Sequence, residues 1–593
     1  MSTAIATVAP EVAVNGSALS ATQLGALTQL RVERGLCMIA RATLRVRDEG
    51  YAFSAGSTFQ LGHQVSIKIP GGTTLFTGVI TGVRLEQASA QQPELVVIAD
   101  DKGYKLLAGI DPNNYEEQTF SDIITALAGD AGLRPDISSG HLSAQSPYLL
   151  RTGSALSYLE AIAQRTGIVW WIDEDALVVR SGGTSSGTTT LSMNQDLINF
   201  SVRASGLRPT GVKVTGWDLS SQQTITGEAS SSSAATRPTA DFVSKYLGGL
   251  AGALGDSQPN VADLFPVTQT EADTIAQALA ETGEAAAVVA RGTCWANPGL
   301  VPGSTVSVTD AGPTSGDYYV SSVEHVYDHR GFTTRFVAGP MRPSGLVDTL
   351  GAPASDAGFR STGLVIGVVS DNKDSEGHYR VKVKFPGLHG GVVSTWARVV
   401  SPGAGSSRGM SFQPEVNDEV LVGFEFGDSR RPVVIGALYS PNNALPKAAE
   451  IVDSSTGKVE YRRMTSRLGH VVELGDSDTP SKQHVLLQLG DGNHKFRLGK
   501  DKTDIEIPSG EKLSIKAGDA SIVFDDQGNI TITGMKIALK ATQDLTVEGL
   551  DVSVKANVKL AAEGGAQLDV KGAIANVQAD GPLALKGAVV NIN

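Results

Sequence analysis

KLSIKAGDASIVFDDQGNITITG, residues 512–534, opens a C-terminal region in which apolar and polar residues alternate in short runs as far as VNIN at 590–593. Further runs are MKIALKA at 535–541, DLTVEG at 544–549, DVSVKA at 551–556 and QLDVKG at 567–572. Such alternation is typical of strands that bury one face. Because one short run builds little core, these strands must pack on neighbours, as in solenoids and intertwined β-prisms. The pattern predicts a thin, stiff rod made by several chains, which is a mechanical part rather than a catalyst.

The composition indicates an acidic protein of several domains with many tight turns. The 593 residues exceed one domain, and the formal net charge of −13 argues against a general nucleic-acid binder, which has a basic face. The 67 glycines fit many turns between short strands. Cys37 and Cys294 are the only cysteines, so the sequence implies no disulfide framework. One bridge between them stays open, but a reducing site of synthesis is the simpler interpretation.

The N-terminal residues MSTAIATVAPEVAVNG contain no basic segment followed by an apolar core, so we expect no secretory signal. No run of about 18 apolar residues is present, so we expect no membrane span. If the protein leaves the cell, we expect it to do so inside an assembled machine or after lysis.

Most of the chain before the C-terminal region predicts strands, with a minor helical part. The helices are indicated by apolar residues that recur at helical spacing, the first with Thr119 or Ser121 as its cap. Their apolar faces are Phe120, Ile123, Ile124 and Leu127 in the first and Leu156, Leu159, Ile162 and Ala163 in the second. The stretch SGGTSSGTTT at 181–190 predicts a flexible connector.

The chain contains a candidate internal repeat. GHQVSI at 62–67 and GSTVSV at 303–308 share the pattern G-x-x-V-S-[IV]. Each is followed by a second and a third strand, FTGVITGV and ELVVIADD in one case, DYYVSSVEHV and TTRFVAG in the other. The alternative is chance similarity between strands. If the repeat is real, it predicts two similar β-barrels in each chain, and a trimer would then present six similar units around its axis.

Residues 360–445 predict five short strands with glycine turns, the size of a small Greek-key barrel. An ordered set of motifs runs through them. It comprises Gly367-Val368-Val369, Asp371-Asn372, Glu376-Gly377, Arg380-Val381-Lys382-Val383, Phe385-Pro386, Trp396-Ala397-Arg398-Val399, Ala404-Gly405, Arg408-Gly409, Phe412-Gln413-Pro414-Glu415, Asp418-Glu419-Val420-Leu421-Val422, Phe424-Glu425, Gly427-Asp428, Arg431-Pro432 and Gly436-Ala437-Leu438-Tyr439.

This set resembles the OB-fold of the spike proteins of contractile injection systems, the VgrG proteins and the phage baseplate hub and spike proteins. Two positions depart from the pattern, Ser375 where the turn often has Pro and Asn417 where Gly is usual. The stretch AIAQRTGIVWWIDEDALVV and the strands around 300–336 resemble the hub of the same family, and SRLGHVVELGD resembles the segment that joins the OB-fold to the prism.

The resemblance implies a mainly β fold with β-barrel hub domains, an OB-fold and a C-terminal trimeric triangular β-helix, or prism. The expected domains are a first hub barrel at 1–110, a helical or mixed insertion at 111–190, a second hub barrel with helices at 191–350, the OB-fold at 351–445, connector hairpins at 446–510 and the prism needle at 511–593.

The function implied by the resemblance is mechanical. The chain would form a homotrimer that caps a hexameric inner tube protein and carries a membrane-puncturing needle. Its other partners would be a PAAR-like tip protein, baseplate proteins, effectors where the machine carries them, and transiently the target membrane, with no nucleic acid. It would be made in the cytoplasm without a signal peptide, assembled into a contractile particle, and delivered or released outside. Phage, type VI and extracellular systems all fit.

We expect the tip protein to meet the blunt end formed by Val590, Asn591, Ile592 and Asn593 of three chains. We expect no enzyme activity and no cofactor. The connector at 446–465 is too short for the lysozyme-like domain of some spikes. The strand pattern runs to Asn593, which indicates no C-terminal toxin. The alternatives are a spike that also has a cell-wall hydrolase or effector activity, and a phage tail spike.

Other candidate chemistry is weak. Ser185 lies in a G-x-S-x-G match inside a Ser/Thr/Gly linker, whereas a nucleophile elbow needs a strand before it and a helix after it. The acidic residues at 371, 374 and 376 predict a solvated turn, because the continuation of a calcium loop is missing. His325 and His329 are interpreted as structural or solvated, and His470, His484 and His494 as residues that could line a trimer axis. We expect no metal.

An OB-fold often binds nucleic acid through a basic groove with exposed aromatics. The arginines and lysines of 380–431 alternate with acids, and Trp396 is interpreted as a core residue. Neither feature favours a nucleic-acid groove.

Overall fold

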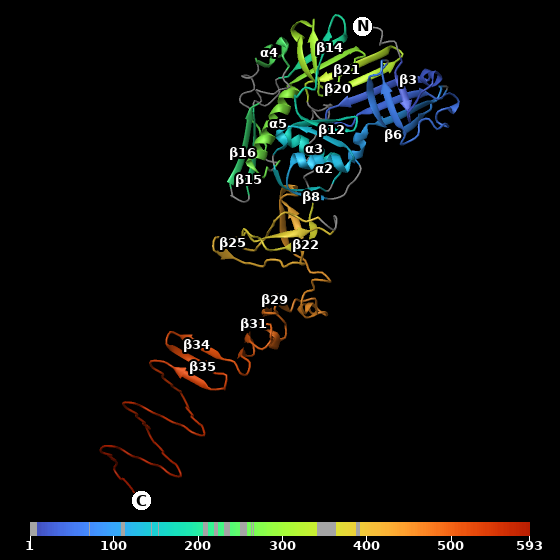
Figure 1. The fold of residues 1–593 in the computed structure, drawn as a ribbon. Helices are drawn as coiled ribbons and strands as arrows, with labels where there is room; N and C mark the ends of the chain where they lie inside the picture. Colours follow the sequence, from blue (N-terminus) through green and yellow to red (C-terminus); the bar gives the residue numbers. More distant parts are fainter. Residues whose placement is uncertain are drawn as a thin grey trace. The chain divides into compact units, whose positions relative to one another are not determined.

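The computed structural model divides into two compact units, residues 1–445 and 446–593 (Figure 1). It describes residues 9–69, 71–89, 91–107, 113–143, 145–151, 153–205, 211–218, 223–230, 238–248, 258–261, 264, 266–340, 363–386 and 392–592. Among these residues, no helix is both long enough and apolar enough to cross a membrane. The stretch GAPASDAG at 351–358, whose composition predicts a linker, lies outside the described residues.

The N-terminal region, residues 9–340, is organised by a 13-stranded sheet. Its first set of strands has the order β3-β4-β7-β6-β5-β1-β2. The strands are β1 (Glu11–Val14), β2 (Ser17–Ala18), β3 (Leu27–Gly35), β4 (Arg41–Arg47), β5 (Gln64–Lys68), β6 (Thr74–Glu86) and β7 (Glu94–Asp100), and helix α1 spans Ala21–Gly25. Alternate residues of these strands enclose a core of their own, which includes Leu30, Leu44 and Val97.

The second set has the order β14-β18-β21-β20, with β19 beside β20 and β13 parallel to β19. The strands are β13 (Thr188–Ser192), β14 (Leu197–Ala204), β18 (Val288–Trp295), β19 (Thr305–Thr309), β20 (Gly316–Asp328) and β21 (Gly331–Ala338). They enclose a separate core that includes Val306, Val320 and Phe336. The predicted connector at 181–190 is wrong in part, because Thr188–Ser192 pairs with β19 through its backbone and so becomes a strand.

The two sets repeat one another strand by strand. The order β5-β6-β7-β4-β3 matches β19-β20-β21-β18-β14, and the long strands β6 and β20 have 13 residues each. The register of both long strands shifts at the same place, between Ile80 and Gly82 in β6 and between Val320 and Ser322 in β20. A shared irregularity of this kind favours a true internal repeat over chance similarity. The sets are not separate bodies, since β3 pairs with β20 and makes them one sheet.

A helical part packs beside this sheet. It contains η2 (Lys102–Leu107), β8 (Asn113–Thr119), α2 (Phe120–Asp130), β9 (Arg134–Ser138), η3 (Gly140–Leu142), β10 (Gln145–Arg151), α3 (Ala155–Thr166), β11 (Ile168–Asp173) and β12 (Ala176–Ser181). Thr119 caps α2 in a capping box with Asp122, as the sequence predicted. The predicted apolar faces of both helices meet around the buried Trp170.

A further layer consists of β15 (Gly211–Asp218), β16 (Gln223–Ser230), β17 (Asn260–Val261), α4 (Asp241–Gly248) and α5 (Gln269–Ala287). Val212 and Val214 of β15 pack on Ile275, Ala276 and Ala280 of α5. The small residues of α5 allow this close packing of helix on sheet.

Five strands in the order β22-β23-β24-β28-β27 close into a barrel. They are β22 (Val365–Asp371), β23 (Arg380–Lys384), β24 (Ala397–Val399), β27 (Glu419–Phe424) and β28 (Pro432–Ala437). Between β24 and β27 the chain leaves the barrel as an arm, residues 400–412, whose two sides pair through β25 (Ala404–Gly405) and β26 (Arg408–Gly409), as Figure 1 shows. Val381, Val383 and Phe385 fill the barrel interior.

The second unit begins with α7 (Ala448–Ile451) and a five-stranded sheet of β29 (Tyr461–Thr465), β30 (Val471–Gly475), β31 (His484–Gln488), β32 (Lys495–Gly499) and β33 (Thr503–Glu506). The strands β34 (Leu513–Ala517), β35 (Ala520–Phe524) and β36 (Ile530–Thr533) form a small antiparallel sheet. Residues 534–592 then run as an open zigzag with no paired strand (Figure 1). The predicted fold class, mainly β with a minor helical part and a closed barrel, is confirmed, whereas the domain boundaries stay predictions.

Candidate functional site

A buried cluster of charges joins the barrel to the helices of the N-terminal region. Glu271, in the first turn of α5, accepts from Arg430 Nη1 at 2.7 Å and from Arg165 Nη1 of α3 at 3.1 Å. Arg430 Nη2 also donates to Asp428 at 2.8 Å, and the four side chains are at most 5% exposed. The second Glu271 oxygen accepts from the Val267 backbone N–H at 2.9 Å, so this carboxylate has donors on both sides.

The electrostatics of the cluster depend on all its members. Burial opposes the charge of Arg430, but attraction by Asp428 and Glu271 outweighs burial and raises the pKa of the guanidinium. Burial would raise the pKa of Asp428, but Arg430 holds that pKa below its usual range. A buried ion group of this kind tolerates loss of one member badly, because the remaining charge keeps its desolvation cost without its partner.

Apolar contacts support the same junction. Tyr148 and Leu150 of β10 belong to the apolar cluster that fills the barrel. The Tyr148 hydroxyl donates to the Val393 carbonyl at 2.6 Å, and burial raises the pKa of Tyr148. One strand of the N-terminal region thus completes the core of the barrel. The sequence alone did not indicate this junction, although two adjacent arginines at 430 and 431 in an apolar setting are a usable signal.

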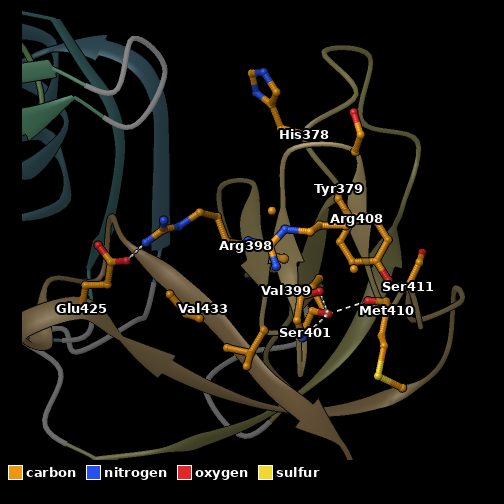
Figure 2. Close-up of a pocket in the computed structure, with 16 residues that line it drawn as sticks. His378, Tyr379, Arg398, Val399, Ser401, Arg408, Met410, Ser411, Glu425 and Val433 are labelled. Atoms are coloured by element: carbon orange, nitrogen blue, oxygen red, sulfur yellow. Dashed lines mark hydrogen bonds and ion pairs between the residues drawn. The ribbon is translucent and has the colours of Figure 1, made fainter.

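A cleft of about 870 Å³ lies between the barrel and its arm (Figure 2). Figure 2 shows Arg398 turned toward Glu425 and Arg408 beside the cleft. The cleft is lined by His378, Tyr379, Arg398–Ser401, Gly403–Gly405, Ser407–Ser411, Glu425 and Val433.

The cationic residues that an OB-fold would use for nucleic acid are mostly engaged elsewhere. Arg380 pairs with Asp374, Arg398 pairs with Glu425, and the guanidinium of Arg430 is buried in the junction. The interpretation of Trp396 as a core residue is wrong, because it is half-buried under Arg380 and Lys382, which lie over its ring at 5.8 and 5.6 Å.

The C-terminal residues present their apolar side chains to solvent. Met535, Leu550 and Val558 are essentially fully exposed, at 98–107%. Of the expected tip residues, Val590 is 48% and Ile592 81% exposed, Asn591 is exposed, and Asn593 lies outside the described residues. A single copy therefore offers no cover for the apolar half of its alternating pattern.

The weak catalytic and calcium candidates have structural roles. The Ser185 hydroxyl donates to the Gly187 carbonyl at 2.8 Å inside a turn, with no helix after it. Asp374 accepts from the backbone N–H groups of Glu376, His378 and Arg380, and the Arg380 guanidinium holds its pKa well below the usual range. This carboxylate organises a turn, and within the described ranges no group of His, Cys, Asp and Glu side chains could hold a metal.

Of the candidate histidines, one is fully buried and the others are partly or fully exposed. His325 is 1% exposed, its Nδ1 lies 2.9 Å from Thr334 Oγ1, and burial together with the Arg34 charge lowers its pKa to about 3. His329 lies in an exposed turn. His484 contacts Glu473, and His494 lies between Asp491 and Glu511, whose carboxylates raise the pKa of His494.

Two family models match different parts of the chain. The family model described as the type VI secretion system/phage-baseplate injector OB domain matches residues 365–439, the barrel and its arm. The family model described as the Alg8 N-terminal domain matches residues 4–328, more than half of the chain.

Curated relatives match shorter stretches. The chain is 29% identical over 154 residues to the type VI secretion system spike protein VgrG5 of Pseudomonas aeruginosa, and this stretch covers 24% of this chain and 19% of the relative. It is 34% identical over 112 residues to the spike protein VgrG3 of Vibrio cholerae, which covers 18% and 11%. The matched stretch thus spans about a fifth or less of the length of these relatives.

Two solved structures are also similar. A type VI secretion component of E. coli aligns with a TM-score of 0.45 at 15% identity, covering 72% of this chain and all of that one. A chain of the Francisella PdpA–VgrG complex aligns with a TM-score of 0.48 at 8% identity, covering 89% and 80%.

The buried cluster predicts a strong response to loss of the Glu271 charge. Glu271→Gln keeps the shape of the side chain but leaves Arg165 and Arg430 buried without their shared anion, and we expect a loss of about 3–5 kcal/mol of stability. Urea unfolding measures it. The control is Glu228→Gln, which breaks the exposed 2.8 Å pair with Lys213 and should cost less than about 1 kcal/mol. Equal losses in both variants would contradict a cooperative buried cluster.

The buried His325 predicts a pH-dependent stability. The pKa of His325 is about 3 in the folded chain and about 6.5 in the unfolded chain. Between these pH values the imidazole is therefore protonated in the unfolded chain and neutral in the folded chain. Stability falls as the pH drops from about 6.5 toward 3, and His325→Leu should reduce this slope by about 1.4 kcal/mol per pH unit between pH 5 and 4. Urea unfolding across that range measures the slope. The exposed His329→Ala should leave the slope unchanged, and an unchanged slope in the His325 variant would refute the assignment.

Proposed function

Since the chain belongs to the family of the Alg8 N-terminal domain and is a VgrG-like spike-hub protein of the type VI secretion or phage-baseplate kind, we propose that it works as a homotrimer that caps an inner tube and carries a puncturing needle. The observation that supports the proposal most directly is the exposed apolar ladder of residues 534–592.

The ladder supports a trimer on energetic grounds. Burial of apolar surface contributes about 25 cal/mol per Å² to stability. In one copy the exposed Leu, Val and Ile side chains contribute none of this free energy, whereas burial between copies would make it available. Backbone groups of the same residues have no strand partner in one chain. Intertwined copies supply both covers at once, and the closed prism that results leaves few free edges.

The repeat supports the proposed contact with a sixfold tube. Two sets of strands with one order and one register irregularity give each chain two similar units. Three copies then present six similar units around one axis, which matches a hexameric tube protein through a closed, self-limiting contact.

The junction supports a mechanical role. Under load, the barrel of such a spike must keep one orientation relative to the rest of the hub. A buried ion cluster with directional hydrogen bonds fixes the barrel against α3 and α5. We propose no enzyme activity for the chain, and its candidate serine, aspartate and histidine residues have structural contacts instead.

The proposed division of the chain keeps the boundaries expected from the sequence, with the hub at 1–350, the OB-fold at 351–445, connector hairpins at 446–510 and the needle from 511 onward. The proposed partners are the tube protein, baseplate proteins, a PAAR-like tip protein on the faces of residues 590–593, and effectors. The particle would be assembled in the cytoplasm and delivered outside.

The native mass of the full-length protein tests the proposal. We expect a stable particle near three times 61.7 kDa by native mass spectrometry. Aspartate in place of both Leu550 and Val558, two of the most exposed apolar residues of the ladder, should weaken the trimer because it would bury charges at the shared faces. Asp substitution of the exposed polar residues Ser553 and Asn557 is the control. A parent chain that is a clean monomer would refute the proposal.

The tip can be tested separately. Deletion of residues 590–593 should abolish binding of a PAAR-type protein while the trimer mass is retained, because the deletion removes the blunt face and leaves the rest of the ladder. Co-purification with a tagged tip protein measures binding. Retained binding in the shortened trimer would show that the tip protein meets another surface.

A further inference from the structure

The surface of the barrel is unusually apolar for a part of the chain whose interior is already filled. Among the described residues, nine large apolar side chains are exposed between 363 and 440, against seven in the whole of 9–340. The nine are Leu364, Ile366, Val400, Met410, Phe412, Val416, Phe426, Ile435 and Tyr439. A concentration of this kind marks a surface that a protein partner covers.

Part of this surface is a ridge on β22 and β27. Ile366 pairs with Leu421, so both side chains lie on the outer face of the barrel. Gly423 follows on the same face, and a Cβ there would lie 3.3 Å from Leu364 and 3.1 Å from Ile435. The absence of a side chain at Gly423 lets Leu364 and Ile435 close over the strand, and the four residues Leu364, Ile366, Leu421 and Ile435 form a continuous apolar ridge.

The other part is the cleft between the barrel and its arm (Figure 2). Val399, Val400 and Met410 give it an apolar floor and wall, and Val400 and Met410 are about half exposed, at 54% and 48%. The Tyr379 hydroxyl at this cleft is shielded from solvent and has no hydrogen-bond partner. An orphaned hydroxyl beside an open cleft indicates that a group supplied by another molecule belongs there.

The cleft and the ridge differ in charge. Arg408 lines the cleft, and no hydrogen bond or ion pair engages its guanidinium within the described residues. Glu419 stands two residues before Leu421 on the same outer face of β27, and its carboxylate likewise has no ion pair among the described residues. The anion at the cleft, Glu425, is engaged by Arg398 and Arg431, so Arg408 lacks an anionic partner in the described part of the chain, and the end of the ridge provides one.

These two surfaces fit one another better than they fit an unrelated partner. The ridge lies on β22 and β27 and reaches Ile435 of β28, and the cleft lies beside β24 and reaches Val433 of β28, so the two surfaces are neighbours on one barrel. A closed ring of copies needs two different complementary surfaces on each copy, one for each neighbour. The apolar ridge with its acid and the apolar cleft with its arginine meet that requirement within one chain.

We propose that the ridge of each barrel inserts into the cleft of the next copy around the threefold axis. Leu364 and Ile366 of one copy pack on Val400 and Met410 of its neighbour, and Glu419 pairs with Arg408 across the contact. The arm of residues 400–412 thereby clasps the neighbouring barrel. This inference rests on the proposed homotrimer and adds the surface by which the barrels recognise one another.

Disulfide cross-linking tests the contact in the full-length chain. The double variant Ile366→Cys and Met410→Cys places one thiol on the ridge and one in the cleft of every copy, so a mild thiol oxidant should link the copies into covalent dimers and closed trimers on a non-reducing denaturing gel. Each single variant should stay at 61.7 kDa, which also controls for the buried Cys294 and half-buried Cys37. The pair Val83→Cys and Met410→Cys, with Val83 exposed in β6, should give no covalent dimers or trimers on the same gel.

Native mass of the same samples separates the two levels of the argument. A trimer without cross-links in the double variant overturns the ridge-and-cleft contact and leaves the proposed function standing. A monomer overturns both. Cross-linking of the control pair as efficient as that of the double variant would also overturn the contact, because the disulfides would then form by random collision of copies.

Charge reversal gives a second readout. In the double-cysteine background, Arg408→Glu or Glu419→Arg alone should slow cross-linking several-fold, because each places like charges across the contact. Both reversals together should restore the parent rate, since the pair is re-formed in the opposite sense. If the combined reversal is as slow as the single ones, Arg408 and Glu419 do not meet.

Discussion

The C-terminal region, from residue 512 onward, depends on one constraint, which is that a strand of about five residues with one apolar face cannot bury that face unless other strands or helices pack on it. The first unit escapes the constraint because its strands pair into larger sheets and a closed barrel, whose apolar faces meet one another or the helices, as the fully buried Phe332 and Trp170 illustrate. Residues 534–592 cannot escape it, and their Leu, Val and Ile side chains stand in solvent. Copies of the chain are the simplest cover, because identical runs offer identical apolar faces.

The same reasoning separates the two kinds of junction in the chain. Within the first unit, the barrel is joined to α3 and α5 by charges that meet inside one copy, with Glu271 accepting from two arginines and a backbone N–H. On the outside of the barrel, Arg408, Glu419 and the Tyr379 hydroxyl have no such partners among the described residues. In the proposed trimer, these unpartnered groups beside apolar surface are the ones that a neighbouring copy would engage.

The sequence predicted those features that follow from local pattern. Thr119 and the spacing of Phe120, Ile123 and Leu127 were sufficient for α2, because capping and amphipathicity are encoded within a few residues. The motifs of the barrel were sufficient for the family, which the OB-domain match confirms. The repeat was visible as G-x-x-V-S-[IV], although its common register irregularity was not.

What the sequence did not reveal depends on residues far apart in the chain. Arg430 meets Glu271 across 159 positions and Thr188–Ser192 becomes a strand only because β19 lies beside it. Trp396 is a large apolar residue of the type that usually lies in a core, but Arg380 and Lys382 cover its ring instead. Each of these depends on tertiary placement, which period and propensity do not encode.

The choice of charges rather than apolar residues at the hub–barrel junction has a physical consequence. Apolar side chains of the same volume would give equal or greater stability, since the desolvation of Glu271, Arg165 and Arg430 offsets much of their attraction. Apolar packing is non-directional, however, and tolerates rotation of one body on another, whereas the guanidinium of Arg430 must meet Glu271 and Asp428 at once. Only one orientation of the barrel satisfies both. If the chain carries a needle as proposed, it needs that single orientation more than it needs a few kcal/mol of stability, and the buried cluster provides it.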